Sequence, residues 1–303
     1  MSRIVRVAMA ALLLAGALAQ SSPGGPVAAK PPDLSAFRGL GAWIDIYDYS
    51  TNAWDATGVM KANGVRTVYL QTGRWNSPTA NNTAQFTDKS KVDWWLHAAH
   101  ARGMKVVGWY LPAYDDMLRD LRRTAMIHTY KTGWGHRFDG VAIDIEYKGQ
   151  VRSLSTWNAR VLEHAQRVRK ALGYSAPIAA ITPAPMGMRI RPDAWAGFPW
   201  KGLAQVSNVF MPMGYWTYRT DCPSNPNHCP HAYTENNVIE TRRLTGNWNA
   251  LVHAIGGVAD TISVADVEDF VLGAQHSKAI GGSLYDYRTM RAEHWRPLAP
   301  LNG

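Results

Sequence analysis

Residues 138–147 read FDGVAIDIEY, a short apolar run that carries two acids near its end. Its β-branched residues alternate with Gly140, Ala142, Asp144 and Glu146, which is the two-residue period of a β-strand. The apolar residues should face a layer of helices, and the two carboxylates should share the opposite face at the end of the strand. Because an acid pair in an apolar strand is costly to bury, we expect a functional site there.

The rest of the chain repeats this unit, in which a short apolar run precedes a segment with helical periodicity. Strands are predicted at residues 42–47, 67–71, 105–110, 140–146, 177–182, 208–213, 250–255 and 282–285. Helices are predicted at residues 54–63, 89–102, 115–130, 153–172, 193–205, 235–244 and 264–278. Eight such units favour a parallel sheet closed into a single-domain (β/α)8 TIM barrel. The alternative is an open doubly wound sheet, which would need a glycine-rich loop that residues 43–54 lack.

The start of the chain reads as an export signal. Arg3 and Arg6 precede an apolar run at residues 7–18, and Ala17-Leu18-Ala19 is a small-x-small cleavage site. We therefore expect a signal peptide over residues 1–19, a flexible linker over residues 20–35 and the catalytic barrel over residues 36–303. A retained membrane anchor is the alternative, but the run is too short for one, so we expect no stable membrane insertion after cleavage.

Cys222 and Cys229 are the only cysteines and lie close together in a loop rich in Pro and Asn. In an exported protein such a pair predicts a disulfide. The alternative is a metal site that also uses His228 and His231, but this spacing matches no common zinc pattern. We expect no metal site and no cofactor.

The formal net charge of +9 would suit acidic partners such as anionic cell-wall polymers, but many exported proteins are simply basic, and this second interpretation is better supported. Basic residues do not form a stripe with interleaved aromatic residues, so we expect no nucleic-acid binding. The chain has 13 Trp and 13 Tyr but 6 Phe. Because the flat faces of Trp and Tyr stack well on sugar rings, this composition is compatible with a carbohydrate-binding protein.

Polar and aromatic side chains gather where the predicted strands end, which is where barrel enzymes carry their active sites. Asp144 and Glu146 are the candidate catalytic residues. The candidate substrate-binding residues are Asp45, Gln71, Arg74, Trp75, Trp109, Tyr110, Tyr215, Trp216, Tyr285 and Asp286. For Trp75, Trp109 and Trp216 the alternative is core packing, and for Asp286 it is an ion pair with Arg288 or Arg74.

Two close carboxylates in a poorly hydrated site do not both ionise readily, so one is pushed toward its protonated form. A carboxylic acid that is protonated near neutral pH is what cleavage of a glycosidic bond needs. Asp144 and Glu146 therefore indicate a glycoside hydrolase.

The same stretch resembles the fourth-strand motif D-G-x-D-x-D-x-E of family 18 glycoside hydrolases, which include chitinases. Asp139, Gly140, Asp144 and Glu146 match this motif, whereas Ala142 replaces its first inner Asp. Residues 213–215 (MGY) match the start of the family's M-x-Y-D motif, and Trp216 replaces its Asp. The chain is also similar to family 25 lysozymes, whose acid layout Asp45, Asp144 and Glu146 fit.

The resemblance implies that Glu146 acts as general acid and base. The substrate's acetamido oxygen would act as nucleophile, while Asp144 and Tyr215 would orient and stabilise that group. Without a carboxylate at Ala142, we expect Asp144 to stay ionised and to interact with Asp45 or Arg74. The alternative is a substrate that lacks an acetamido group, with Asp144 as a conventional nucleophile.

We therefore predict a secreted or cell-envelope glycoside hydrolase that acts as a monomer on a polysaccharide. The favoured substrate is an N-acetylhexosamine polymer such as peptidoglycan or chitin. One alternative is a hydrolase of a non-acetylated exopolysaccharide or cell-wall glycan, such as a galactosaminan or arabinan. Another is a sugar-binding barrel without catalytic activity.

Overall fold

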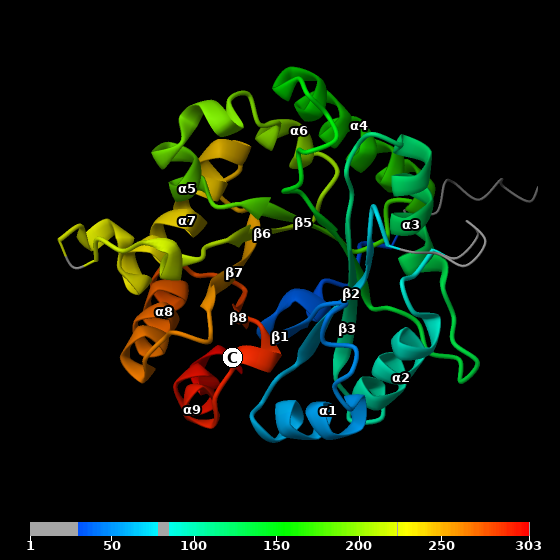
Figure 1. Cartoon of the computed structure of the whole chain (residues 1–303), viewed down its shortest axis with the longest axis horizontal. Helices are drawn as coiled ribbons and strands as arrows, with labels where there is room; N and C mark the ends of the chain where they lie inside the picture. Colours follow the sequence, from blue (N-terminus) through cyan, green and yellow to red (C-terminus); the bar gives the residue numbers. More distant parts are fainter. Residues whose placement is uncertain (1–29, 78–84, 223, 303) are drawn as a thin grey trace, which may run out of the picture. The chain divides into compact units, whose positions relative to one another are not determined.

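The computed structural model describes residues 30–77, 85–222 and 224–302 of the chain. Eight parallel strands pair in sequence order, and β1 (Gly39–Ile44) pairs with β8 (Gly281–Tyr285), so that the sheet closes on itself (Figure 1). The structure thus confirms the predicted (β/α)8 barrel, which lies within the unit Pro31–Gly303. The predicted signal peptide and most of the predicted linker lie outside the described residues.

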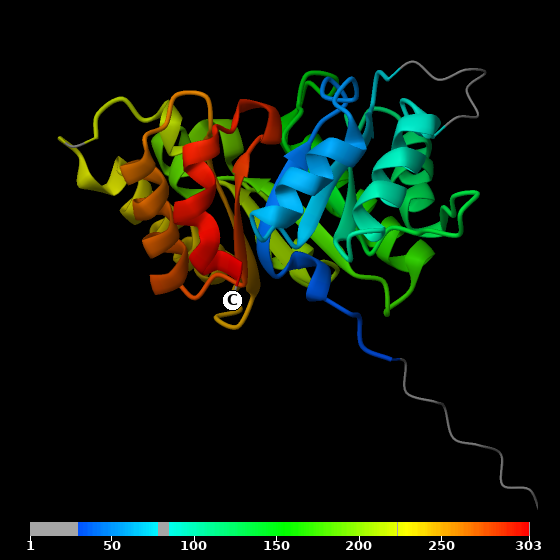
Figure 2. The same ribbon diagram turned by 90° about the horizontal axis from the view of Figure 1, so that it is seen from below.

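Helices follow the strands around the barrel. The remaining strands are β2 (Thr67–Arg74), β3 (Lys105–Leu111), β4 (Gly140–Asp144), β5 (Ile178–Pro183), β6 (Val209–Met213) and β7 (Leu251–Val258). The helices are α1 (Ala53–Ala62), α2 (Lys89–His100), α3 (Met117–Thr129), α4 (Leu154–Leu172), α5 (Pro185–Ile190), α6 (Trp200–Leu203), α7 (Pro230–Thr245), α8 (Val264–His276) and α9 (Trp295–Leu298). Figure 2 shows the barrel from the side, with the last helix, α9, beside α8.

Several element bounds differ from the prediction for local reasons. β1 begins at Gly39, three residues earlier than predicted. It ends at Ile44, because the Asp45 carboxylate accepts a hydrogen bond from the backbone N–H of Tyr47 and turns the chain. A short, irregular helix was predicted around residues 193–205, and the structure has a 3-10 turn at Pro192–Trp195 and the short helix α6 there, with α5 directly before them. α7 begins at Pro230, five residues earlier than predicted, because proline suits the first position of a helix.

Successive residues of each strand pack alternately into two cores, one inside the barrel and one between the sheet and the helices. Inward residues such as Trp43, Tyr69, Ala142 and Met211 fill the barrel interior. Outward residues of the same strands pack against the surrounding helices, as Val141, Ile143 and Ile145 do beside Ala142 and Asp144. The alternation predicted for residues 138–147 is therefore confirmed, and it points Asp144 toward the barrel axis.

The barrel interior is tightly packed at its base. A Cβ atom on Gly41 would lie 2.3 Å from the ring of Tyr69, which stacks on Trp43 at 4.5 Å between ring centroids. His253 is fully buried there and makes hydrogen-bonding contacts with Tyr69 and Ser283. Burial lowers the pKa of His253 to about 4, so this histidine is a neutral core residue near neutral pH.

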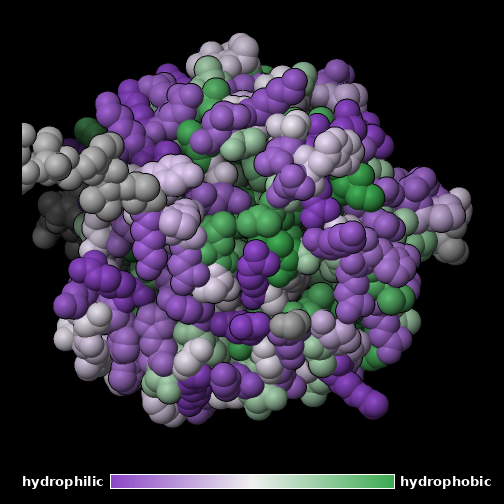
Figure 3. All heavy atoms as spheres, turned by 180° about the vertical axis from the view of Figure 1, so that it is seen from behind, coloured by the Kyte–Doolittle hydropathy of each residue, from purple (hydrophilic) through white to green (hydrophobic). Residues whose placement is uncertain are grey.

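The face behind the view of Figure 1 is mostly hydrophilic, with a smaller hydrophobic area near its centre (Figure 3). Among the described residues, none of the helices has the length and apolar character needed to cross a membrane.

Candidate active site

A cavity of about 200 Å³ opens where the strands end, and most of the predicted site residues line it. The predicted residues that line it are Asp45, Gln71, Arg74, Trp109, Asp144, Glu146, Tyr215 and Tyr285. They come from β1, β2, β3, β4, β6 and β8 or from the residues just beyond them, so barrel closure brings together side chains that are up to 240 positions apart in the sequence.

A second cavity of about 230 Å³ adjoins the first. Glu146, Met213 and Tyr215 line both cavities, so the Glu146 carboxyl lies where the two meet. The other residues of the second cavity are Pro183, Ala184, Gly187, Arg191, Trp195, Tyr218, Arg219 and Tyr233. A chain molecule could therefore extend to both sides of Glu146.

Asp144 is the last residue of β4, and its side chain is only 5% exposed. Burial and then the nearby charge of Glu146 raise the pKa of Asp144 well above its usual range. Its Oδ1 atom has no hydrogen-bond partner among the described residues. The raised pKa opposes the expectation that Asp144 stays ionised, and among the described residues no hydrogen bond or ion pair joins its carboxyl to Asp45 or Arg74.

Glu146 lies two residues beyond the end of β4 and is accessible from the cavities. The segment is held in place because the N–H of Ile145 donates to the carbonyl of Ile181 and the indole N–H of Trp157 donates to the carbonyl of Tyr147. Surrounding protein atoms still reduce the hydration of the carboxyl, and this desolvation raises the pKa of Glu146. Both acids thus hold protons more strongly than free carboxyls do.

Tyr215 lies beside this acid pair. Burial, followed by the charges of Glu146 and Asp144, raises the pKa of Tyr215 well above its usual value, so its hydroxyl keeps its proton. The preceding residue, Gly214, donates its N–H to the carbonyl of Ile255 on β7 and so anchors the turn that carries Tyr215. Tyr215 can therefore donate a hydrogen bond to a group placed next to the acids.

Asp45 and Gln71 form a fixed polar rim on the other side of the first cavity. Asp45 Oδ2 accepts a hydrogen bond of 3.0 Å from the hydroxyl of Tyr285. Gln71 accepts a hydrogen bond of 3.1 Å from the N–H of Ile46, which fixes the connection after β1. These contacts fix the side chains of Asp45 and Gln71, which both line the first cavity.

Asp286 lines neither cavity, and among the described residues it forms no ion pair with Arg288 or Arg74. It accepts a hydrogen bond from the N–H of Thr289 and lies with Asp45 and Asp48 in a buried group of carboxylates. Arg288 instead lies 3.5 Å from Asp48. Burial and the charges of Asp45 and Asp286 raise the pKa of Asp48 to about 6.

Three other predicted residues do not line either cavity. Tyr110 points outward and donates a hydrogen bond of 2.7 Å to buried Asp120, because adjacent strand residues face opposite sides and Trp109 faces inward. Trp216 packs on Phe270 in the outer core. Trp75 stacks on Tyr147, with 5.1 Å between ring centroids.

Sequence reasoning missed several residues that line the cavities. Tyr47 and Trp43 belong to the first cavity, and Tyr218, Arg219 and Tyr233 belong to the second. Tyr47 and Trp43 stand in the stretch WIDIYDY, where inward alternation indicates Trp43. Tyr233 lies on α7, and its place in the cavity depends on tertiary packing that no local pattern reveals.

The predicted disulfide between Cys222 and Cys229 is present. Cys222 lies three residues after Arg219 of the second cavity, and Cys229 caps the start of α7, which carries Tyr233. The bond therefore links the two segments that supply this side of the cavity.

The structural comparison finds (β/α)8 barrels of glycoside hydrolases. An endo-β-1,4-mannanase from Thermotoga petrophila matches with a TM-score of 0.61 and 11% identity, covering 83% of this chain and 68% of that chain. A chitinase from Rhizomucor miehei matches with 0.58 and 13%, covering 87% and 100%. A chitinase from Bacteroides thetaiotaomicron matches with 0.62 and 10%, covering 88% and 95%. Because the identities are this low, these matches establish a shared fold and nothing more.

Comparison of the sequence with family models and with curated proteins gives no match. The function of this chain must therefore be inferred from the chemistry of its site.

Proposed function

We propose that this protein is a secreted glycoside hydrolase that cleaves a polysaccharide, with Glu146 as general acid and base. The observation that carries the proposal is the position of Glu146 at the junction of two cavities, beside Asp144 and Tyr215. A sugar polymer that occupied both cavities would present a glycosidic bond to this carboxyl. Solved structures of similar fold include enzymes named as chitinases and a mannanase, which supports a polysaccharide as substrate.

The raised pKa of Glu146 suits the first chemical step. Protonated Glu146 donates its proton to the glycosidic oxygen as the bond from that oxygen to the anomeric carbon breaks. The leaving sugar departs with that proton through the second cavity. Glu146, now a carboxylate, then takes a proton from a water molecule whose oxygen attacks the anomeric carbon, which restores the acid.

The geometry around Asp144 suits a substrate-assisted route. The carbonyl oxygen of a 2-acetamido group would attack the anomeric carbon as the leaving group departs, forming a cyclic intermediate that water then opens. Asp144 has an oxygen without a partner and would hold the acetamido N–H, while the Tyr215 hydroxyl would donate to the acetamido oxygen. Ala142 occupies the position two residues before Asp144 where the family 18 motif has another acid. In this chain burial, rather than that acid, would keep the Asp144 carboxyl protonated.

The lining of the cavities favours an N-acetylhexosamine polymer that also carries acidic groups. Trp109, Ile181 and Ile255 give the first cavity flat and apolar surfaces for a sugar ring and an acetamido methyl group. Arg191 and Arg219 bring positive charge to the second cavity. A polymer with carboxylates close to its sugars, such as peptidoglycan with its acidic peptide stems, fits this pair better than the uncharged units of chitin.

Export is the remaining part of the proposal. The disulfide between Cys222 and Cys229 suits an oxidising compartment, in agreement with the signal peptide predicted over residues 1–19.

A panel of polymers tests the proposal. Wild type and Glu146→Gln would be incubated with peptidoglycan, chitin, their de-N-acetylated forms and an arabinan or galactosaminan, and released reducing ends would be measured. We expect cleavage of peptidoglycan and a loss of about 10²–10⁴ in rate for Glu146→Gln, the usual contribution of a general acid. Glu163→Gln, which changes a half-exposed acid on α4 that pairs with Arg167, should retain full activity and is the matched control.

Each other outcome has a distinct meaning. Cleavage of only the non-acetylated polymers would overturn the substrate-assisted route but would still support a glycoside hydrolase. Binding of sugars without cleavage would contradict the proposed enzyme activity and would indicate a carbohydrate-binding barrel. Equal activity of Glu146→Gln and wild type would remove Glu146 from the mechanism.

A further inference from the structure

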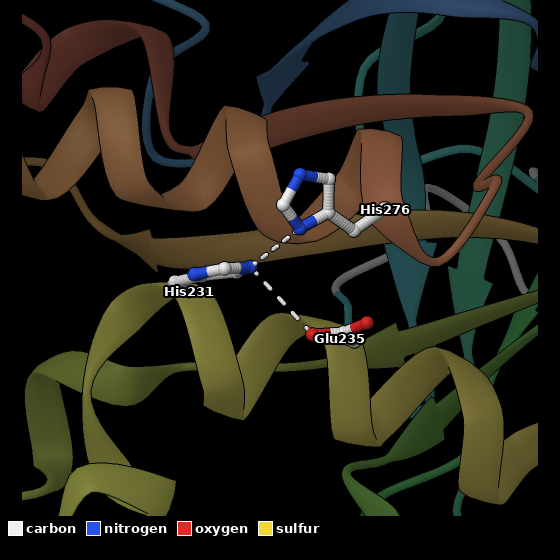
Figure 4. A group of neighbouring side chains, drawn as sticks. All are labelled: His231, Glu235 and His276. Carbon is white, nitrogen blue, oxygen red and sulfur yellow. Dashed lines mark hydrogen bonds and ion pairs between the residues drawn. The ribbon is translucent and has the colours of Figure 1, made fainter.

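A cluster of three side chains lies where α7 and α8 meet, outside both cavities. His231 and Glu235 stand one turn apart on α7, and His276 is the last residue of α8 (Figure 4). His231 Nε2 lies 3.0 Å from His276 Nδ1 and 3.6 Å from Glu235 Oε2. One ligand atom from each residue lies within 4.8 Å of the others, so the three side chains converge on one point.

These distances are close to those of a metal site. Zinc bonds nitrogen and oxygen ligands at about 2.0–2.2 Å, which places neighbouring ligands of a tetrahedral site roughly 3.3–3.6 Å apart. Of the two separations, that between the imidazoles (3.0 Å) lies slightly below this range, and that between His231 and Glu235 (3.6 Å) lies at its upper end. A shift of a few tenths of an ångström in one imidazole would therefore admit an ion in place of the hydrogen bond between the rings.

The backbone that carries the cluster is already fixed. A Cβ atom on Gly273 would lie 2.4 Å from the carbonyl oxygen of His231, so α8 packs directly against the first turn of α7. Cys229, two residues before His231, is tied to Cys222 by the disulfide. Little chain entropy would be lost on binding, because packing and the disulfide have already ordered the ligands.

We propose that His231, Glu235 and His276 bind a divalent transition-metal ion of the Zn²⁺ type and thereby tie α7 to α8. Two imidazoles and one carboxylate are ligands that suit Zn²⁺, whereas Mg²⁺ and Ca²⁺ prefer sites made of oxygen alone. His231 and Glu235 are partly exposed, so a water molecule can take the fourth position. The ion would brace the turn that carries Tyr233 at the second cavity, whatever reaction the protein catalyses.

A second histidine cluster provides a matched control. His136 Nε2 lies 3.2 Å from His97, its Nδ1 lies 3.2 Å from His100, and His100 also contacts Asp139 at 2.8 Å. The two ring nitrogens of His136 thus contact two different histidines. The four side chains therefore lie in a row and do not converge on one point. Loss of His136 should leave metal binding at α7 and α8 unchanged.

Calorimetric titration with Zn²⁺ after treatment with a chelator tests the site. Wild type and His136→Ala should bind one ion per chain with equal affinity, while His231→Ala, His276→Ala and Glu235→Gln should each bind at least about tenfold more weakly. Zn²⁺ at 100 times its dissociation constant should raise the melting temperature of wild type by roughly 5 °C and leave that of His276→Ala unchanged. Mg²⁺ should produce neither effect.

Two results would overturn the proposal. One is the absence of stoichiometric Zn²⁺ binding in wild type. The other is binding that survives in all three α7 and α8 variants or is lost in His136→Ala. Because these readouts need no substrate, they stay separate from any failure of the proposed hydrolase activity.

Discussion

At the scale of single residues, the two acids of the site differ in how the barrel holds them. Asp144 ends β4 and is buried with one oxygen unpartnered, whereas Glu146 lies beyond the strand and reaches both cavities. The sequence spacing predicts that the two share a face. It does not predict which acid is buried, because that depends on where β4 ends and on the residues packed around it. The structure makes Glu146 the acid that a polymer can reach.

The burial of Asp144 predicts a change in stability with pH. Folding raises the pKa of Asp144, so the native chain holds this proton more strongly than the unfolded chain does. The free energy of unfolding therefore falls as pH rises from about 4, the range of a free carboxyl, through the native pKa. Asp144→Asn should remove this loss and be more stable than wild type at neutral pH by on the order of 1 kcal/mol or more, because only the unfolded wild-type chain releases this proton readily.

Chemical denaturation between about pH 4 and 8 measures this difference, since the gain should shrink as wild-type Asp144 becomes protonated in both states. Asp269→Asn, at an exposed position on α8, is the control and should follow wild type at every pH. A variant at Asp144 that is less stable than wild type at neutral pH would show that the carboxyl has a stabilising partner. Activity should fall in the same variant, because site residues often trade stability for function.

At the scale of elements, strand alternation accounts for most of what sequence could predict about the site. It places Asp45, Gln71, Trp109 and Asp144 inward at successive strand ends, as the structure has them. The same rule excludes Tyr110, which directly follows Trp109 and therefore faces the helices. Beyond the strand ends the period is lost, so the positions of Trp216, Asp286 and the start of α7 depend on turns, capping and tertiary contacts.

The loop between β6 and α7 should depend on its disulfide. The bond joins residues seven positions apart, and closing a loop of this size contributes about 2–3 kcal/mol in the chain-entropy account. We expect the double variant Cys222→Ser/Cys229→Ser to melt roughly 4–5 °C lower than wild type. The KM should also rise, because Arg219 and Tyr233 at the two ends of this loop would lose their fixed spacing.

Thermal melting and steady-state kinetics of the oxidised wild type and the double variant test this role. Reduced wild type is the matched control, because it lacks the bond and keeps both cysteines, and it should behave like the variant. A variant with the melting temperature and KM of oxidised wild type would mean that the loop holds its shape without the bond.

At the scale of the whole molecule, the order of strands and helices was enough to predict the closed barrel and the rim that carries the site. Closure joins β1 to β8 and so brings Asp45 within 3.0 Å of Tyr285, a contact that no local motif indicates. The division of the site into two cavities could not be predicted, because Arg191, Arg219 and Tyr233 come from separate connections whose folding depends on tertiary packing. The polymer proposed as substrate follows from this division.

The most direct test of the account is whether Glu146 gives a proton to the leaving group. The measurement compares wild type with Glu146→Gln on two substrates that share the same sugar, one with a sugar leaving group and one with a 2,4-dinitrophenyl group, which leaves without protonation. We predict a loss of about 10²–10⁴ in rate on the first substrate and a much smaller loss of the bond-breaking step on the second. Equal losses on both substrates, or no loss on either, would contradict the role of Glu146 and with it the proposed hydrolase mechanism.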